Sequence, residues 1–395
     1  MEEKKYNILI VHNRYQIPGG EDTVMQQEAD LLRSHGHHVF VYERNNAELK
    51  EMTPLQKAVL PFTVVYSFKT EKEVRSLIKE HHIDLVHVHN TILLVSPSVF
   101  DAARKEHVPV IQTLHNFRMI CPNALLYRDG KVCTDCLQHG LNCAVKNRCY
   151  RGSRAETIAL VLSMRFSRLR GIYRYPSYIC LTEFNRNMLL KQGQISERQI
   201  FVKPNSTEDP GTPLPVSSRK NTVIFAGRLE EIKGIRFLLD VWKEMGKDAP
   251  ELQMYGDGPL EPYCEEFLQQ HQELPVRLFG RKLHKEVLEA MRNASAVILP
   301  TQVYEGFPMT LVEAFSCGTP AIVPDFGNAG ALVQEEINGW HYKQNDAESL
   351  INVLHHRTDL IQSTYESFRK QYTSEQNYRK LMEIYQTVLR REESL

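Results

Sequence analysis

Two glutamates, Glu305 and Glu313, stand with seven residues between them in the chain. Glu305 precedes Gly306 and Pro308, which favour a loop, and Glu313 falls about one turn inside a helix expected over 310–315. The unpaired N–H groups at the start of that helix would form an anion site between the two carboxylates. Two acids that bind hydroxyls around a site that binds phosphate fit a nucleotide sugar, although an ordinary acidic first turn also explains them.

Other candidate groups follow predicted strands. Arg228 and Lys233 are suited to a diphosphate, or are simply solvated surface charges. Gly19 and Gly20 follow the first strand, where glycine lets the backbone approach a phosphate or a sugar closely, or makes a simple turn. His115 ends a strand, and a lone histidine there is usually structural.

Composition bounds the class of protein. The length of 395 residues favours two domains, and 42% hydrophobic with 24% charged residues is typical of a globular protein. The formal net charge is zero, so nucleic acid is not an expected partner. No apolar run approaches the roughly 20 residues of a membrane span, and the N-terminus does not read as a signal peptide. We therefore expect a cytoplasmic protein whose eight cysteines are not disulfides by default.

Short β-branched runs alternate with amphipathic segments in two series, which predicts βα units on parallel sheets. The predicted strands are 7–11, 38–42, 85–89, 108–114, 178–182 and 200–203 in the first series, and 222–226, 252–255, 276–279, 296–299 and 321–323 in the second. The predicted helices include 22–34, 71–80, 236–245, 285–294 and 374–390. Four prolines and a glycine in 204–215 mark the linker.

The stretch 304–314, Tyr-Glu-Gly-Phe-Pro-Met-Thr-Leu-Val-Glu-Ala, resembles the E-x7-E motif of retaining glycosyltransferases of family 4 (glycosyl transferases group 1). The loop 227–234 resembles the diphosphate-binding loop of that family, and Pro204-Asn205 its Pro-Asn-Gly hinge, with Ser206 in place of the usual glycine. Loops 256–259 and 279–281 are similar to those that frame the nucleotide base. The resemblance covers nearly the whole chain and is strongest over 221–342.

This resemblance implies an α/β fold of GT-B architecture, with two Rossmann-like doubly wound parallel-sheet domains facing across a cleft. The implied domains are an acceptor-binding domain at 1–205 with a cysteine-rich insertion at about 117–152, and a nucleotide-sugar-binding domain at 206–373. A C-terminal helix at 374–395 would return to the N-terminal domain.

The resemblance also implies roles. Glu313 would hold the ribose hydroxyls and Glu305 the donor sugar, while Arg228, Lys233 and the backbone of 309–312 would neutralise the leaving diphosphate. The implied catalytic set is His115, Arg228, Lys233 and Glu305. The implied donor-binding set is Gly19, Gly20, Asn205, Gly280, Phe307, Pro308, Met309, Thr310, Leu311 and Glu313. The two cations make a catalytic metal unnecessary, so no cofactor is expected for catalysis.

A cysteine-rich insertion departs from the family pattern. Five of the eight cysteines fall within 121–149, and Cys133 and Cys136 have the spacing of half a zinc site. Cys121 and Cys143 would complete a structural zinc site, with Cys149 as an alternative ligand. The other interpretations are a loop that carries free thiols, or disulfides if the compartment is oxidising.

A basic, aromatic stretch follows the insertion. Between 146 and 174, eight Lys and Arg residues accompany a single acid, Glu156. Arg165, Arg168, Arg170 and Arg174 would contact anionic lipid headgroups at the inner face of the cell membrane. The alternative is a solvated helix whose apolar side belongs to the core.

The sequence therefore predicts a retaining, metal-independent glycosyltransferase. It would move a sugar from a UDP- or GDP-sugar to a saccharide or lipid-linked acceptor in cell-surface polysaccharide or glycoconjugate synthesis. A glycoside hydrolase, which also uses two carboxylates, and a non-catalytic membrane-associated scaffold of the same fold are the alternatives.

Overall fold

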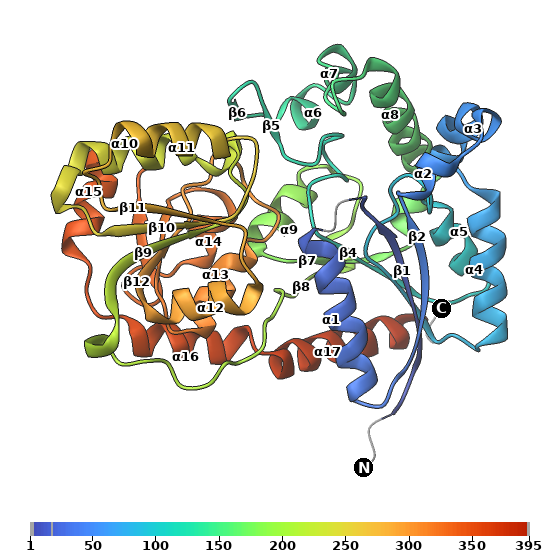
Figure 1. The fold of residues 1–395 in the computed structure, drawn as a ribbon. Helices are drawn as coiled ribbons and strands as arrows, with labels where there is room; N and C mark the ends of the chain where they lie inside the picture. Colours follow the sequence, from blue (N-terminus) through green and yellow to red (C-terminus); the bar gives the residue numbers. More distant parts are fainter. Residues whose placement is uncertain (1–3, 17–18, 393–395) are drawn as a thin grey trace. The chain divides into compact units, whose positions relative to one another are not determined.

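The computed structural model describes residues 4–16 and 19–392 (Figure 1). The first three residues of the predicted N-terminal domain and the last three of the predicted C-terminal helix lie outside the described residues. The chain divides into two compact units. The first comprises Met1–Leu126, Cys133–Lys203 and Tyr378–Leu395, and the second comprises Tyr127–Val132 and Pro204–Asn377.

The first unit holds a six-stranded parallel sheet in the order β2-β1-β3-β4-β7-β8. Its strands are β1 (Asn7–Arg14), β2 (His38–Asn45), β3 (Leu85–Val88), β4 (Val110–Leu114), β7 (Ser177–Cys180) and β8 (Ile200–Val202). Its helices are α1 (Gly20–Ser34), α2 (Glu48–Glu51), α3 (Pro54–Val65), α4 (Phe68–Glu80), α5 (Ser98–Lys105), α6 (Asp135–Gln138), α7 (Asn142–Lys146), α8 (Arg154–Leu169) and α9 (Glu183–Leu190).

The second unit holds another six-stranded parallel sheet, in the order β11-β10-β9-β12-β13-β14. Its strands are β9 (Lys220–Ala226), β10 (Glu251–Tyr255), β11 (Val276–Gly280), β12 (Ala294–Ile298), β13 (Ala321–Pro324) and β14 (Gly339–Tyr342). Its helices are α10 (Ile235–Met245), α11 (Glu261–Gln270), α12 (His284–Asn293), α13 (Met309–Ser316), α14 (Gly327–Leu332), α15 (Ala347–His356) and α16 (Ile361–Gln371). The short hairpin of β5 (Tyr127–Arg128) and β6 (Lys131–Val132) is counted with this unit.

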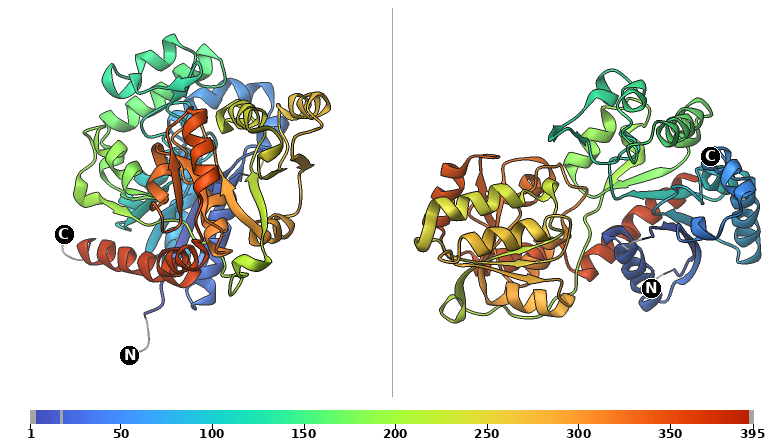
Figure 2. Two further views of the ribbon diagram at one scale, coloured as in Figure 1. Left: turned by 90° about the vertical axis from the view of Figure 1, so that its left-hand side faces the viewer. Right: turned by 45° about the horizontal axis from the view of Figure 1, so that its top comes forward.

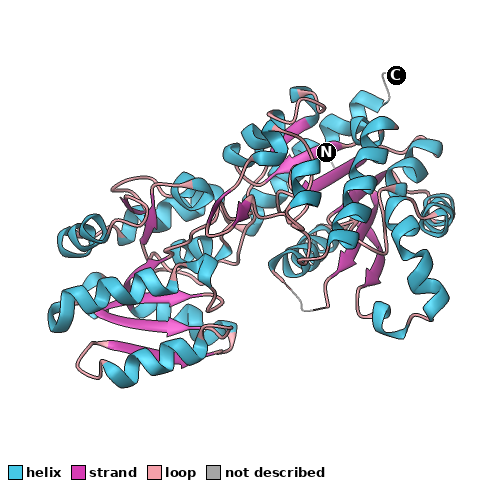
Figure 3. Ribbon diagram, turned by 90° about the horizontal axis from the view of Figure 1, so that it is seen from above, coloured by secondary structure: helices cyan, strands magenta, loops and turns pink. Residues whose placement is uncertain are grey.

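Alternation along β1 explains how the first sheet is buried on both faces. Ile8 and Ile10 pack with α1 and with the C-terminal helix α17 (Ser374–Glu392), whereas Leu9 and Val11 pack with α4 and α5. A strand covered on both sides is apolar at successive positions, as this one is. Figure 2 shows α17, in red, beside the blue elements of the first unit, and Figure 3 shows helices on both sides of each sheet.

The α/β prediction with two doubly wound parallel sheets is confirmed. The strand β14 has no counterpart among the predicted strands, because glycine and histidine interrupt the apolar residues of its sequence, Gly-Trp-His-Tyr. In each sheet the strand order reverses once, between β1 and β3 in the first and between β9 and β12 in the second. Ligands of such folds bind outside the carboxyl ends of the strands at this reversal.

Candidate functional site

The reversal point of the second sheet brings together the two predicted motifs of that unit. Gly227 and Arg228 follow β9, and Glu305 lies in the loop that follows β12. Gly234 has a φ of 72°, and a Cβ on it would lie 1.9 Å from the carbonyl oxygen of Pro300. Only glycine therefore lets the two loops pack this closely.

Lys233 and Glu305 form an ion pair at this point. Lys233 Nζ lies 2.6 Å from Glu305 Oε1, which also accepts a hydrogen bond of 2.7 Å from Thr301 Oγ1. Both charged side chains are largely buried, with relative exposures of 22% and 12%. The cation expected to hold a diphosphate and the acid expected to hold a sugar are thus adjacent.

The backbone of Glu305 is in an unusual conformation. Its φ is 52°, a region that L-residues seldom occupy. The side-chain amide of Asn328 donates to the carbonyl oxygens of Glu305 and Gly306 at 2.7 and 2.9 Å and so fixes the turn. Non-glycine residues in such conformations cluster at functional sites. Asn328 lies 23 residues downstream of Glu305 and stands in none of the motifs found in the sequence.

The helix α13 begins beside Glu305, and Glu313 lies in its second turn. Pro308 is the N-cap and supplies no side-chain cap. The amide of Leu311 donates to the carbonyl of Pro308 at 3.0 Å, and its side chain is fully buried. The amides of Met309 and Thr310 have no backbone acceptor among the described residues, so an anion at this helix start would contact these two amides.

Glu313 has a partner that sequence reasoning missed. His284 Nε2, at the start of α12, lies 3.0 Å from Glu313 Oε1. The hydrogen bond with Glu313 raises the pKa of His284 above its usual value. No local pattern marks His284, because only the fold brings α12 beside α13.

The remaining predicted donor-site residues differ in their surroundings. Arg228 is 59% exposed and pairs with Glu230 at 2.6 Å, apart from the Lys233–Glu305 pair. Gly280 has a φ of 65° and open space where a Cβ would lie. Asn205 is buried, and its Oδ1 has no hydrogen-bond partner among the described residues. Phe307 is partly buried and packs on the core beside α13.

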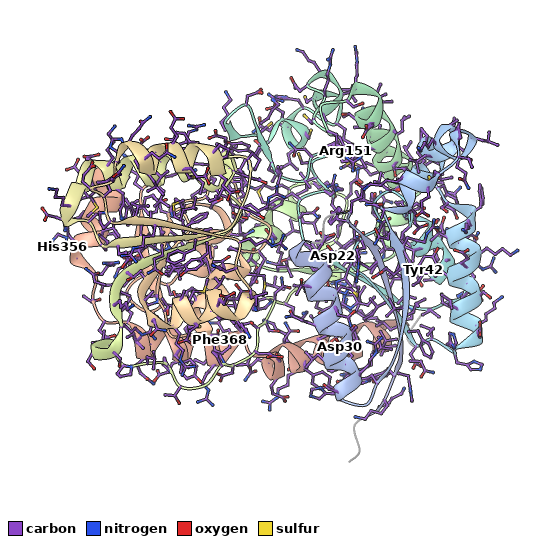
Figure 4. All side chains as sticks on the ribbon, in the orientation of Figure 1. Asp22, Asp30, Tyr42, Arg151, His356 and Phe368 are labelled. Carbon is purple, nitrogen blue, oxygen red and sulfur yellow. The ribbon has the colours of Figure 1, made fainter. Side chains whose placement is uncertain are left out.

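In the first unit, the glycine pair lies at the start of α1. Gly19 is the N-cap, and its amide donates to Asp22 Oδ2 at 2.7 Å. His12 Nε2 donates to Asp22 Oδ1 at 2.8 Å. Burial opposes ionisation of Asp22, but the bonds from His12 and Gly19 outweigh it and lower its pKa. Asp22 is labelled on α1 in Figure 4. The space beside Gly20 is open, because a Cβ added to this residue would meet no atom within 4 Å.

Glu21, the next residue after the glycines, is a titratable group that the sequence analysis did not select. Its carboxylate accepts hydrogen bonds from the side-chain amides of Asn90 and Asn116 at 2.8 and 3.2 Å. Burial raises the pKa of Glu21 to about 7. Asn90 and Asn116 follow β3 and β4, so this polar group lies at the carboxyl edge of the first sheet, where a hydroxyl-rich ligand is expected.

His115 lies beside this group and contacts a second histidine. His115 Nε2 is 2.9 Å from His89 Nδ1, and the rings stack with centroids 5.2 Å apart. Burial, with a contribution from His89, holds the pKa of His115 well below its usual value, so the ring is neutral at neutral pH. His89, His115 and Asn116 line a cavity of about 60 Å³ within this unit.

His87 and His89 share a buried group with Glu28 of α1. In residues 4–16 and 19–392, these side chains form the only group of three or more His, Cys, Asp or Glu residues that could together hold a metal ion. Their possible ligand atoms all lie within 4.8 Å of one another. Lys203 Nζ already lies 2.9 Å from Glu28 Oε2, with both side chains buried. The ammonium group therefore supplies the positive charge that a metal ion would bring.

The cysteines of the insertion are near one another but not at coordinating distance. Cys121, Cys133, Cys136 and Cys143 are free thiols, and in the described part of the chain no three cysteines bring their sulfurs within 4.8 Å. Burial raises the pKa of Cys136 to about 12, and the nearby Cys121, Cys149 and Cys143 add to the shift. The structural zinc stays a prediction.

The arginines of the basic stretch have different surroundings. Arg165, Arg170 and Arg174 are exposed, whereas Arg168 is partly buried and donates to the carbonyl of Met119 at 3.1 Å. Burial lowers the pKa of Arg168. Arg168 thus has a structural contact that the sequence did not reveal.

An exposed apolar surface accompanies these arginines. The helix α8 packs against α3, as Figure 1 shows. Large apolar side chains are exposed on these helices and at the start of α4: Leu55, Val59, Phe62, Phe68, Ile158, Leu162 and Leu169. The stripe on α3 could not be told from a core-facing one in the sequence. None of the described helices combines the length and apolar character of a membrane span.

A larger cavity, of about 470 Å³, lies elsewhere in the second unit. Its lining includes Lys220, Ser295 and Pro320, which stand at or just before the amino ends of β9, β12 and β13. The ligand edge of a parallel sheet is the carboxyl edge, so this cavity is not the candidate site.

Two family models and several known proteins match this chain. A model described as Glycosyltransferase Family 4 matches residues 18–208, and one described as Glycosyl transferases group 1 matches residues 220–357. The UDP-Gal:alpha-D-GlcNAc-diphosphoundecaprenol alpha-1,3-galactosyltransferase of Escherichia coli is 22% identical over 366 residues, covering 86% of this chain and 85% of that protein. For several other curated relatives, the chain spans less than half of the relative's length.

Two solved structures share the fold. A glycosyltransferase from Rickettsia africae superposes with a TM-score of 0.69 at 17% identity, covering 98% of this chain and 99% of that one. The Anabaena protein HepE in complex with UDP-glucose superposes with a TM-score of 0.62 at 15% identity, covering 97% of this chain and all of that one.

Proposed function

Because the chain belongs to the glycosyltransferases, with a family 4 domain followed by a group 1 domain, we propose that it transfers a sugar from a UDP-sugar with retention of configuration. The observation that carries this proposal is the Lys233–Glu305 pair at the reversal point of the second sheet. The pair offers a cation for the diphosphate and an acid for sugar hydroxyls at the edge where nucleotides bind. The complex of HepE with UDP-glucose supports UDP as the carrier.

The leaving diphosphate would be stabilised by side chains and helix amides in this proposal. Lys233 is held in place by Glu305, and Arg228 is exposed and can turn toward the phosphates. The amides of Met309 and Thr310 add two neutral donors. Stabilising charge that develops in the transition state is usually the largest catalytic effect, and these cations could supply it without a divalent metal.

The acids do not favour a glycoside hydrolase. Such an enzyme needs one carboxylic acid that protonates the leaving oxygen. Here Glu305 is paired with Lys233, and Glu313 is paired with His284. Each carboxylate is therefore already in contact with a basic side chain, in a position to accept hydrogen bonds from hydroxyl groups.

The acceptor would bind to the first unit. Glu21, Asn90 and Asn116 gather carboxylate and amide groups at its carboxyl edge, which suits a saccharide. The E. coli relative acts on a sugar linked to diphosphoundecaprenol, which supports a lipid-linked saccharide acceptor and a role in polysaccharide synthesis.

Donor binding provides the test of this proposal. In a thermal-shift panel of UDP- and GDP-sugars, a UDP-sugar should raise the melting temperature, because a ligand that binds only the folded state stabilises it. Glu313→Gln should bind UDP-sugar about tenfold or more weakly by calorimetry, because a neutral amide is a poorer acceptor for two ribose hydroxyls. Glu348→Gln on α15 is the matched control and should bind like wild type.

Two outcomes would contradict it. If no nucleotide sugar shifts the melting temperature, the chain is a scaffold of this fold rather than an enzyme. If Glu313→Gln binds as tightly as wild type, the ribose contact is made elsewhere.

We also propose that the surface formed by α3 and α8 contacts the anionic lipids on the inner face of the cell membrane. The exposed apolar side chains on these helices would enter the lipid boundary, and Arg165, Arg170 and Arg174 would meet the headgroups. Each basic residue near such a surface contributes about 1 kcal/mol. A lipid-linked acceptor would be available at this location.

Liposome sedimentation checks the membrane contact. Wild type should pellet with anionic vesicles, remain in solution with neutral ones, and dissociate at high salt, because the attraction is screened. Replacing Arg165, Arg170 and Arg174 by glutamine should reduce pelleting by an order of magnitude or more. Arg277→Gln in the second unit is the control. If wild type and the triple variant pellet equally, the arginines of the basic stretch do not bind lipid and are simply solvated.

A further inference from the structure

Four side chains run in sequence through the interior of the first unit to His115. Lys203 Nζ lies 2.9 Å from Glu28 Oε2, Glu28 Oε1 lies 3.5 Å from His89 Nε2, and His89 Nδ1 lies 2.9 Å from His115 Nε2. The first three side chains are at most 3% exposed, and His115 lines the small cavity at the carboxyl edge. They come from the end of β8, from α1, from the end of β3 and from the end of β4.

Glu28 is ionised in this arrangement. It contacts the ammonium of Lys203 where neither side chain reaches water, and two buried charges are tolerable only as a pair. Burial alone would raise the pKa of Glu28, but Lys203 and His87 hold it well below the usual value. Both Glu28 oxygens are therefore hydrogen-bond acceptors.

The ionised carboxylate determines which nitrogen of His89 carries the proton. In the described part of the chain, neither Glu28 Oε1 nor His89 Nε2 has a well-aligned hydrogen-bond partner. Glu28 Oε1 lies 3.0 Å from His87 Nδ1 and 3.5 Å from His89 Nε2, and a carboxylate oxygen can accept from both rings. Glu28 Oε1 and His89 Nε2 attract only if Nε2 bears hydrogen. Burial, with help from His87, lowers the pKa of His89 to about 4, so its ring is neutral and Nδ1 carries a lone pair.

We propose that His89 is a positioning residue that holds His115 as the Nε2–H tautomer, so that His115 presents an unprotonated Nδ1 to a hydroxyl of the bound sugar. His89 Nδ1 can only accept, and so His115 Nε2 must donate across the 2.9 Å contact. No hydrogen bond from a described residue reaches Nδ1 of His115. His115 then accepts a hydrogen bond from its ligand and cannot serve as a general acid.

Other polar groups face this chain and agree with the assignment. His12 of β1 lies edge-on to His89, with ring centroids 6.3 Å apart, and donates to Asp22. The Nδ1 of His87 on β3 lies 3.0 Å from Glu28 Oε1 and 2.7 Å from the Tyr385 hydroxyl of α17. The Nε2 of His87 lies 2.8 Å from Thr113 Oγ1 of β4. Lys203 and the neighbouring imidazoles oppose a positive charge on His115, and only Glu28 favours one.

This inference rests on the proposed function in one respect, the identity of the ligand as a sugar. The tautomer itself is a property of the unliganded chain. The tautomer of His115 is measured by spectroscopy in the absence of substrate, and sugar transfer is measured by an activity assay. One of these proposals can therefore be wrong while the other is right.

Nitrogen NMR tests the tautomer directly. Full-length protein labelled with ¹⁵N-histidine should give, at neutral pH, a His115 resonance pair with a protonated Nε2 and an unprotonated Nδ1. His115→Gln assigns the signals. A wild-type spectrum in which His115 is protonated at Nδ1, or at both nitrogens, would overturn the proposal, and this measurement needs no variant that has to fold.

Two substitutions of His89 separate positioning from packing. Asparagine at 89 places an oxygen acceptor near the position of Nδ1, so His89→Asn should keep the His115 tautomer and most of the turnover. Phenylalanine keeps the ring but removes the acceptor, so His89→Phe should give a tautomer mixture and roughly tenfold lower kcat with UDP-sugar affinity unchanged. If His89→Phe leaves the His115 spectrum unchanged, His89 does not hold the tautomer.

Discussion

Replacing Lys233 by alanine should lower kcat by about 10²-fold or more, because the leaving diphosphate would lose its most closely held cation. Lys233 is partly buried, and its ammonium is fixed 2.6 Å from Glu305 and directed by the tight turn at Gly234. A fixed charge stabilises the transition state without reorganising at the moment of reaction. Steady-state kinetics with the UDP-sugar found in the donor panel provides the measurement.

The matched variants distinguish catalysis from general charge effects. Arg228→Ala should also lower kcat by about 10²-fold, since an exposed guanidinium at the same loop can clamp a diphosphate. Arg236→Ala, which removes a nearby cation paired with Glu231 and stacked on Tyr263, should leave kcat within about twofold. If Lys233→Ala changed only the KM for the acceptor, its proposed role at the diphosphate would be wrong.

The elements that carry this chemistry were predictable from the sequence because their patterns are local. The strand around Ile8–Val11 is recognised from its run of apolar residues, and the loop 227–234 from its glycines and basic residues. Both patterns lie within a few consecutive residues. The parallel pairing then follows, since consecutive βα units place each strand's carboxyl end at one edge. For this reason Lys233 and Glu305, although 72 residues apart, come together as the fold class implies.

The partners of the predicted residues could not be found in this way. His284 reaches Glu313 from another helix, Asn328 reaches Glu305 from α14, and Glu28 reaches His89 from α1. None of these three residues stands in a local motif, and the distance that matters is set by how helices pack on the sheet. The exposed stripe on α3 was missed for a related reason: an apolar helix face looks the same in sequence whether a sheet covers it or not.

The interior of the first unit gives the largest expected effect on stability. Lys203→Met should lower the free energy of unfolding by about 3–5 kcal/mol, because it leaves the buried Glu28 carboxylate without its cation. Denaturant unfolding followed by circular dichroism measures this. Arg186→Met, which removes a surface cation that contacts Glu183 and Glu197, is the control and should cost no more than about 1 kcal/mol.

The double variant and the pH dependence identify the cause. Adding Glu28→Gln to Lys203→Met should recover part of the loss, since a neutral amide is cheaper to bury than an unpaired charge. The pKa of Glu28 is lowered on folding, so its ion pair contributes stability above the usual carboxyl pKa and loses it as the pH falls through the folded value. The difference between wild type and Lys203→Met should therefore be fully present above the usual carboxyl pKa of 4.5 and shrink as the pH falls below it. A difference that stays constant with pH would mean that Lys203 stabilises the unit through packing of its chain, and not through its charge.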